Sequence, residues 1–209
     1  MYKKVAEEVS AKFLNIEGNK FIASHFAIQF ILKIIKDFNV TSVLEIGLGI
    51  GSISDAILKY SELNNLDITY TGTENNDYCL RVLPNNVEHY NKIDLFEDIN
   101  ALQTSAPFDL IIIDGTDNLD NIKKFGHPNT IIFIEGLRSK QVESIKKLYP
   151  KAIHVEVISL MKKLKRNSTE MKWNGGGQLI FLEPSNYRKA YAFKEKVSSF
   201  LKRRLRKIV

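Results

Sequence analysis

Apolar residues recur along this chain in two alternating patterns, which predict helices and strands in turn. Residues 2–14 and 21–38 carry apolar side chains at helical spacing, and the second stretch has a broad apolar stripe. The runs FDLIIID (108–114) and NTIIFIE (129–135) are continuously apolar, which is typical of parallel strands buried on both faces. The alternation of the two patterns predicts a doubly wound α/β domain.

The same patterns place the remaining elements. Strands are expected at 41–46, 67–73, 87–92, 108–114, 129–135, 152–159 and 177–183. Further helices are expected near 77–83, 96–103, 117–125 and 137–148, and Ser52 with Asp55 predicts a capping box that opens another. No obvious helix joins the last two strands, so we expect an antiparallel pair at the sheet edge. The predicted fold is therefore a Rossmann-like sheet of seven mostly parallel strands, with the last strand antiparallel and helices on both faces.

The length of 209 residues suits one well-cored domain. We expect N-terminal helices at 1–39, an α/β core at 40–184 and a basic helix at 185–209. No apolar stretch approaches the roughly 20 residues that cross a bilayer, the N-terminus lacks an apolar signal core, and the single Cys79 excludes an intramolecular disulfide. These features predict a cytoplasmic protein; a homo-oligomer stays open.

Most of the net charge of +6 lies in the C-terminal segment. Residues 186–209 contain nine Lys or Arg and one acid, which leaves 21 basic and 23 acidic residues elsewhere. The segment also places apolar side chains at helical spacing between Phe193 and Ile208. A basic amphipathic helix can pack on its own domain, lie on an anionic membrane surface or bind nucleic acid. Nucleic acid is disfavoured because aromatic and basic residues are not interleaved through the domain.

A glycine-rich turn, LEIGLGIG, follows the first predicted strand. Gly47, Gly49 and Gly51 suit a tight turn that lets a ligand approach the backbone, and the next helix would offer unpaired N–H groups there. The dinucleotide fingerprint is G-x-G-x-x-G, whereas this chain has Ser52 where its last glycine would fall. The turn therefore predicts a ligand site but not, by itself, a dinucleotide.

Acidic residues follow the next three predicted strands. Glu74 ends the second strand, where a carboxylate can accept both hydroxyls of a ribose, as in an NAD site. Asp94 follows the third strand and could accept the exocyclic amine of adenine, and Asp114 ends the fourth. Because the carboxyl ends of parallel strands meet at one edge of the sheet, these groups predict a nucleoside crevice.

Four motifs carry a family resemblance over about residues 40–184: VLEIGLGIGSI (43–53), TGTENN (71–76), NKIDLF (91–96) and FDLIIIDG (108–115). In order and spacing they resemble the class I S-adenosylmethionine-dependent methyltransferases. The resemblance implies an antiparallel last strand and S-adenosylmethionine as the cofactor. The residues it assigns to that cofactor are Glu45, Gly47, Gly49, Gly51, Glu74, Asn75, Asp94 and Asp114.

The resemblance also bears on the methyl acceptor. The segment DGTD (114–117) lacks the proline and aromatic residues that nucleobase amino-methyltransferases carry after strand four, so it looks more like the small-molecule and sugar O-methyltransferases. By that likeness Asp114 is the general base or a Mg²⁺ ligand, and Glu135 assists it. Gly136 stands where a further acid or amide ligand is often found, so Mg²⁺ stays open. An RNA or protein methyltransferase, and a non-catalytic nucleoside-binding module, are the alternatives.

Topology separates the four histidines. His127 precedes the fifth predicted strand, so it should lie at the end of the sheet away from the site, in a turn or capping role. His89 and His154 fall within predicted strands. His25, in the helix before the first strand, is retained as a candidate substrate contact.

Basic residues near the crevice could face a phosphate or carboxylate on the substrate. Arg138 follows the fifth strand, and Lys163 and Arg166 lie in the long connection between the last two strands. A solvated loop is the alternative for that connection, and Trp173 with the glycines after it could form a hinge or simply join the core.

Overall fold

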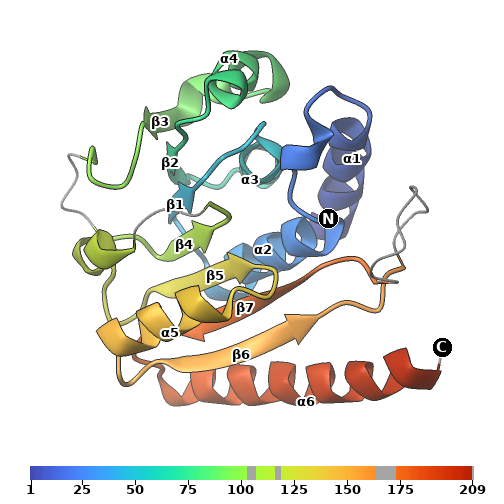
Figure 1. The fold of residues 1–209 in the computed structure, drawn as a ribbon, viewed down its shortest axis with the longest axis vertical. Helices are drawn as coiled ribbons and strands as arrows, with labels where there is room; N and C mark the ends of the chain where they lie inside the picture. The colour runs from blue at the N-terminus through green and yellow to red at the C-terminus, as the bar shows by residue number, and fades with distance from the viewer. Residues whose placement is uncertain (103–106, 116–118, 163–172, 209) are drawn as a thin grey trace.

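A single seven-stranded sheet organises the molecule, in the order β3-β2-β1-β4-β5-β7-β6 (Figure 1). The computed structural model describes residues 1–102, 107–115, 119–162 and 173–208. The strands are β1 (Ser42–Ile46), β2 (Thr69–Thr73), β3 (Ile93–Phe96), β4 (Leu110–Ile113), β5 (Ile131–Glu135), β6 (Ile153–Ile158) and β7 (Gly176–Phe181). β7 runs antiparallel to both of its neighbours, β5 and β6, whereas the other neighbouring strand pairs are parallel. The predicted fold class and the antiparallel last strand are confirmed.

Helices cover both faces of the sheet (Figure 1). One face carries α1 (Tyr2–Leu14), α2 (His25–Phe38), α3 (Ser52–Leu63), α4 (Asp77–Asn86) and α6 (Asn186–Ile208). The other carries the 3₁₀ helix η3 (Asp120–Lys124) and α5 (Ser139–Leu148). Short 3₁₀ turns, η1 (Asn19–Phe21) and η2 (Tyr90–Lys92), complete the described elements.

The central strands are apolar throughout because each of their faces has its own core. In β4, Leu110 and Ile112 join the cluster under α1 to α3, whereas Ile111 and Ile113 join the cluster under α5. All four side chains are fully buried. Successive side chains of a strand point to opposite faces, so a strand covered on both sides needs apolar residues at every position.

Three predicted elements differ in the structure. The third strand begins at Ile93 rather than near residue 87, and η2 occupies part of its expected place. Residues 97–102, expected to open a helix, form turns instead. Asp98 Oδ1 accepts hydrogen bonds from the N–H groups of Asn100 (2.6 Å) and Ala101 (3.0 Å), and such local side-chain bonds compete with a helix. The helix expected near 117–125 is the 3₁₀ helix η3 within its described part.

The N-terminal boundaries of two helices also differ from expectation. Helix α2 begins at His25 rather than 21, with Ser24 as its N-cap: Ser24 Oγ accepts from Ala27 N–H at 3.2 Å. The capping box at Ser52 and Asp55 is wrong, because α3 starts after Gly51 without a side-chain cap. Both side chains are buried and bind other segments instead.

Candidate active site at the carboxyl ends of the strands

Four carboxyl groups lie where β1, β2, β4 and β5 end. Glu45 is the fourth residue of β1, Glu74 follows β2, Asp114 follows β4 and Glu135 ends β5. Their charges act on one another, since Glu74, Asp114 and Glu135 all raise the pKa of the Glu45 carboxyl. The structure therefore brings together the acids that the sequence placed after separate strands.

The glycine turn runs from β1 into α3 with backbone angles that disfavour a side chain. Gly47, Gly49 and Gly51 have φ of 87°, 56° and 96°. A Cβ on Gly47 would stand 2.7 Å from the Cα of Gly115, and one on Gly49 would stand 2.5 Å from the carbonyl oxygen of Phe21. The predicted tight turn is confirmed, but the close approach is made by the protein's own backbone.

Glu74 is oriented by three backbone N–H groups. Gly49 donates to Oε2 at 2.7 Å, and Asn75 and Asn76 donate to Oε1 at 2.9 and 2.7 Å. The residue is only 9% exposed. A carboxylate has about four acceptor positions, so one stays available after these bonds. Asn75 contributes its backbone N–H here. Its side chain is exposed and has no hydrogen-bond partner among the described residues.

Glu45 is completely buried on the face of the sheet that packs against α3. The hydroxyl of Tyr70 donates to its Oε2, while Oε1 has no hydrogen-bond partner among the described residues. Burial raises the pKa of Glu45 well above its usual value, the bond from Tyr70 opposes that rise, and the neighbouring carboxylates add to it. A buried oxygen without a partner is costly, so this one marks a place where the site is incomplete.

Asp114 and Glu135 form a hydrogen-bonded pair of carboxyl groups. Burial, the charge of Glu135 and the hydrogen bond between the two side chains together raise the pKa of Asp114 to about 8, against the opposing charge of Arg138. Two adjacent carboxyl groups in a poorly solvated position hold a shared proton more firmly than either would alone. The pair can therefore store a proton at the mouth of the crevice.

Arg138 is turned toward the Asp114 loop. Its Nη1 donates to the carbonyl of Gly115 at 2.6 Å, and its Nη2 donates to the carbonyl of Asp114 at 2.7 Å and to Oδ1 at 3.2 Å. Gln141 adds a bond to the Gly115 carbonyl at 3.0 Å. These bonds hold the loop in place, and the substrate contact of Arg138 stays a prediction.

The segment 18–24 passes over the crevice, a feature that sequence reasoning missed. Ala23 N–H donates to Ser52 Oγ at 3.0 Å, and Ser24 N–H donates to Glu135 Oε1 at 2.6 Å. The segment has no glycine-rich or acidic motif, and its contacts are made by backbone N–H groups, which every non-proline residue carries. No sequence signal therefore distinguished it.

His25 follows this segment as the first residue of α2. Its ring is partly buried, and burial lowers its pKa while the charge of Glu7 opposes the change. His25 directly follows Ser24 in the chain, and Ser24 N–H donates to Glu135, one of the candidate catalytic residues. Its predicted substrate contact stays a prediction.

Asp94 does not follow the third strand, as expected, but lies within it. It pairs with Thr71 in the β2–β3 register and is exposed, and the strand continues to Phe96. The strand was misplaced by several residues, which shifted its carboxyl end. The contact of Asp94 with adenine stays a prediction, and Lys163 and Arg166 lie outside the described residues.

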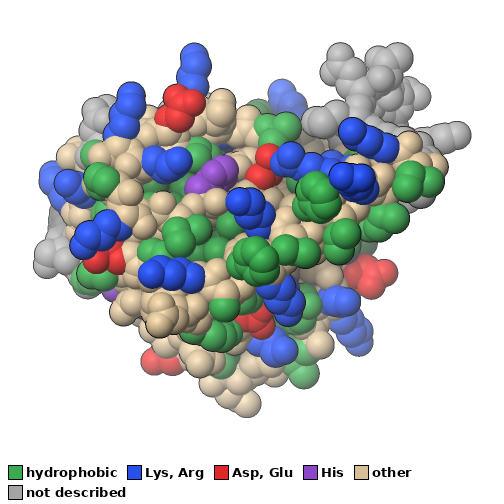
Figure 2. Space-filling model, turned by 90° about the horizontal axis from the view of Figure 1, so that it is seen from below, with side chains coloured by type: hydrophobic (Ala, Val, Ile, Leu, Met, Phe, Trp, Pro, Cys, Tyr) green, Lys and Arg blue, Asp and Glu red, His purple; other side chains and the backbone are tan. Residues whose placement is uncertain are grey.

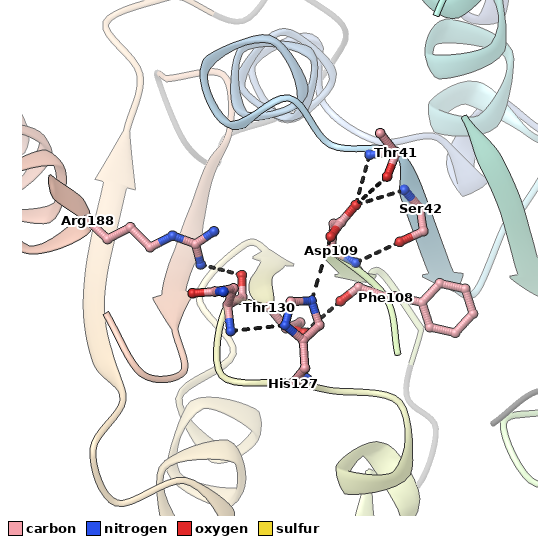
Figure 3. Close-up of polar contacts among 8 residues, drawn as sticks. Thr41, Ser42, Phe108, Asp109, His127, Thr130 and Arg188 are labelled. Carbon is pink, nitrogen blue, oxygen red and sulfur yellow. Dashed lines mark hydrogen bonds and ion pairs between the residues drawn. The ribbon is translucent and has the colours of Figure 1, made fainter. Parts of the chain in front are cut away.

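Two of the remaining histidines, His127 and His154, have side-chain partners in the structure. His127 lies at the amino end of the parallel strands, where its Nε2 is 3.6 Å from Asp109 Oδ1 and its Nδ1 accepts from Asn129 N–H at 3.2 Å (Figure 3). The predicted turn role is confirmed. His89 precedes η2 rather than lying in a strand, and His154 lies in β6 with its Nε2 2.7 Å from Gln178 Oε1.

Asp109 links the strands at that amino end (Figure 3). Its Oδ2 accepts from the N–H of Thr41 at 2.9 Å, from its hydroxyl at 2.8 Å, and from Ser42 N–H at 3.1 Å. Burial acts to raise the pKa of Asp109, but these hydrogen bonds outweigh it and lower the pKa. This network joins β1 to β4 at the end opposite the crevice, so its polar residues serve the fold.

Mg²⁺, which the sequence left open, would have Asp114 and Glu135 as ligands among the described residues. Within the described ranges there is no group of three or more His, Cys, Asp or Glu side chains that could hold a metal ion.

A hollow of about 510 Å³ lies between α2, the end of β6 and α6, and Phe26, Phe30 and Lys33 contribute to its lining. Phe26 is two residues beyond Ser24, so the hollow adjoins the segment that covers Glu135.

No protein-family model matches this sequence, and no curated protein matches it. Solved structures do. The structure is similar to that of an O-methyltransferase from Bacillus cereus in complex with S-adenosylhomocysteine, at TM-score 0.61 and 14% identity over 86% of this chain and 90% of that one. It is also similar to the O-methyltransferase TomG from Streptomyces achromogenes in complex with S-adenosylmethionine, at TM-score 0.60 and 10% identity over 87% and 90% of the two chains.

A third similar structure is the methyltransferase PaMTH1 from Podospora anserina bound to S-adenosylhomocysteine, at TM-score 0.57 and 13% identity over 84% of this chain and 86% of that one. The three similarities span most of each chain, so they compare whole folds. This chain has the fold of the class I S-adenosylmethionine-dependent methyltransferases.

Proposed function

We propose that this protein is a methyltransferase that uses S-adenosylmethionine to methylate a hydroxyl group of a small molecule or a sugar. The observation that carries the proposal is the Glu74 carboxylate beside the glycine turn, which three backbone N–H groups hold in a fixed orientation. S-adenosylmethionine carries a sulfonium and an ammonium group against one carboxylate. The ammonium group is a donor that the carboxyl oxygens at the strand ends can accept.

The residues fit this cofactor in two respects. The free acceptor position on Glu74 suits a ribose hydroxyl, because the three N–H bonds hold the carboxylate in a fixed orientation. The unpartnered Oε1 of Glu45 is an acceptor that a donor from a ligand or an ordered water would satisfy. Both groups stand beside the glycine turn.

The chemistry asks little of the protein beyond alignment and removal of one proton. When bound, S-adenosylmethionine supplies a methyl group on a sulfonium, whose C–S bond breaks as the new O–C bond forms. The deprotonated Asp114 carboxylate takes the proton of the acceptor hydroxyl, and its hydrogen bond with Glu135 shares that proton. Arg138 keeps the Asp114 loop in place through its bonds to two carbonyl groups.

Calorimetry with S-adenosylhomocysteine tests the cofactor. Glu74→Gln keeps the size of the side chain but removes its charge and one acceptor oxygen, so we expect affinity to fall about tenfold. Glu62→Gln, on an exposed side chain of α3 (57% accessible), is the matched control and should bind like the wild type. A wild-type protein that does not bind the cofactor product would remove the proposal.

Transfer of a radiolabelled methyl group tests the reaction. Sugars, phenols, RNA and protein are offered in parallel, and we expect label on a sugar or phenol hydroxyl. Asp114→Asn should abolish transfer and leave the affinity for S-adenosylhomocysteine within about threefold, because general-base catalysis contributes roughly 10²–10⁴ to a rate. Label on RNA or protein would select that alternative. Binding without transfer to any acceptor would favour a non-catalytic nucleoside-binding module.

A further inference from the structure

Helix α6 lies along the β6 edge of the sheet and packs through a partly polar face. The buried residues of this helix are Tyr191, Ala192, Glu195 and Ser199. At about 100° of rotation per residue they share one side of the helix. The helix therefore packs on its own domain, one of the three outcomes expected from sequence, but not through its large apolar residues.

A hydrogen-bond network with α2 sets this orientation. Lys33 Nζ lies 3.0 Å from Glu195 Oε1 and 3.2 Å from Asp37 Oδ2, and it also bonds the hydroxyl of Tyr191. Tyr191 in turn donates to Asp37 Oδ2 at 3.1 Å. Turning α6 about its axis would leave Glu195 and Lys33 partly buried and unpaired, which is strongly unfavourable.

The opposite face of α6 is apolar and exposed to solvent. Phe193 is 69% exposed, Phe200 54%, Leu201 55% and Ile208 82%. Val197 and Leu205, at 41% and 46%, extend the same surface. A helix on the surface of a domain ordinarily buries such a stripe and turns its polar residues outward. We call these six residues the apolar face of α6.

Basic side chains border the apolar face. Lys189 and Lys196 lie seven residues apart along one side of it, and Lys207 continues that row. Arg203 lies in the same row, but its Nη2 is paired with Glu156 Oε2 at 2.5 Å. Arg204 lies within the face, with its guanidinium 5.0 Å from the ring of Phe200. Figure 2, which views the molecule from the α6 side, shows the green and blue side chains gathered together there.

We propose that the apolar face of α6 docks the protein onto an anionic lipid surface. The helix would lie in the plane of the surface, with its apolar side chains among the acyl chains and the basic row against lipid phosphates. Its 23 residues would extend over about 35 Å. No helix in the described ranges is long and apolar enough to span a bilayer, so the association is peripheral.

Charge favours a lipid surface over a second copy of the chain. Residues 186–209 hold nine basic residues, and their one acid, Glu195, is buried against Lys33. Arg188, Arg203 and Arg206 bond other segments of the domain, which leaves six basic residues for the outer surface of the helix. Two such faces brought together would place like charges opposite each other, which disfavours a symmetric dimer. The large exposed apolar side chains distinguish the surface from a nucleic-acid site, which would need stacking aromatics along a basic groove.

Vesicle co-sedimentation tests the proposal, independently of any methyl transfer. We expect the protein to bind vesicles of phosphatidylcholine with about one quarter phosphatidylglycerol, to bind pure phosphatidylcholine far less, and to be released by salt. The double variant Phe193→Ser and Phe200→Ser should bind at least about tenfold less tightly. Lys196→Glu with Lys207→Glu should weaken binding to a similar degree. Leu63→Ser, at a residue 52% exposed on α3, is the matched control.

All substituted residues are exposed, so the variants should keep the wild-type melting temperature. Failure of the wild type to bind anionic vesicles would overturn the proposal, as would undiminished binding by the double variant. A concentration-dependent dimer that the double variant loses, without vesicle binding, would assign the face to a second copy. Salt-sensitive binding to RNA that depends on the basic row, without vesicle binding, would assign it to nucleic acid.

Discussion

Replacement of Asp114 by Asn is expected to change how stability depends on pH. In the folded protein, burial and the neighbouring Glu135 raise the pKa of Asp114 to about 8, whereas its usual value is 3.8. The native state therefore binds more protons than the unfolded state between these values. Stability from this group is fully present at low pH and is lost as the pH rises toward 8. Asn does not titrate, so the variant lacks this contribution.

The size of the effect follows from the interval between the two pKa values. Each unit of pKa corresponds to about 1.4 kcal/mol, so the full interval sets an upper limit of about 6 kcal/mol. The Asp114 side chain is 21% exposed, so screening by solvent reduces the effect. We expect about 2–4 kcal/mol of the wild-type stability to disappear between about pH 5 and pH 8.5 through this group.

Urea unfolding near these two pH values measures the difference. The wild type should be more stable at the lower pH, and Asp114→Asn should lose most of that difference while keeping its fold. Some of it should persist, because the pKa of Glu45 is also raised by burial. Asp67→Asn, on an exposed residue, controls for the substitution and should follow the wild type. An Asp114→Asn protein with the full wild-type pH dependence would refute the reasoning.

Two further predictions concern stability. Gly49→Ala should cost at least about 2 kcal/mol of unfolding free energy, because its Cβ would stand 2.5 Å from the Phe21 carbonyl oxygen. Gly136 is the matched control, because it also has positive φ but no atom would lie within 4 Å of its Cβ, so Gly136→Ala should cost about 1 kcal/mol. Equal losses in urea unfolding would contradict the steric argument. Lys33→Met should cost about 2 kcal/mol by leaving Glu195 without its cation, discounted because Lys33 is 27% exposed. Stability within about 0.5 kcal/mol of the wild type would show that the network does not hold α6.

The local pattern of apolar residues was sufficient to locate the central strands. It was insufficient to locate elements that are short or half exposed. Strands covered on both faces are apolar at every position, so β4 and β5 stand out in the sequence. The edge strand β3 has four residues, and Asp94 among them is exposed, so its pattern hardly differs from that of the turns before it. The helix expected near residue 96 does not form, because Asp98 Oδ1 accepts hydrogen bonds from backbone N–H groups of its predicted first turn.

Glu74, Asp114 and Glu135 were identifiable because the ends of their strands are readable from sequence and parallel strands end together, whereas the misplaced end of β3 misplaced Asp94. Their relationships were not. That Glu135 shares a hydrogen bond with Asp114, while Arg138 is held by the carbonyls of the same loop, depends on side-chain directions that no spacing encodes. The cover formed by residues 18–24 was equally invisible, since backbone N–H groups make its bonds to Ser52 and Glu135.

By itself, the sequence determined the fold class, the glycine turn and the positions of Glu74, Asp114 and Glu135 at strand ends, because these follow from local periodicity and chain order. Only the tertiary structure decided which groups share a proton and which face of α6 points outward. In that helix, apolar spacing left three outcomes open, and the bonds of Glu195 and Tyr191 with Lys33 turn Phe193 and Phe200 to solvent. Those partners come from α2, more than 150 residues earlier in the chain, and such long-range pairing is the information that local pattern lacks.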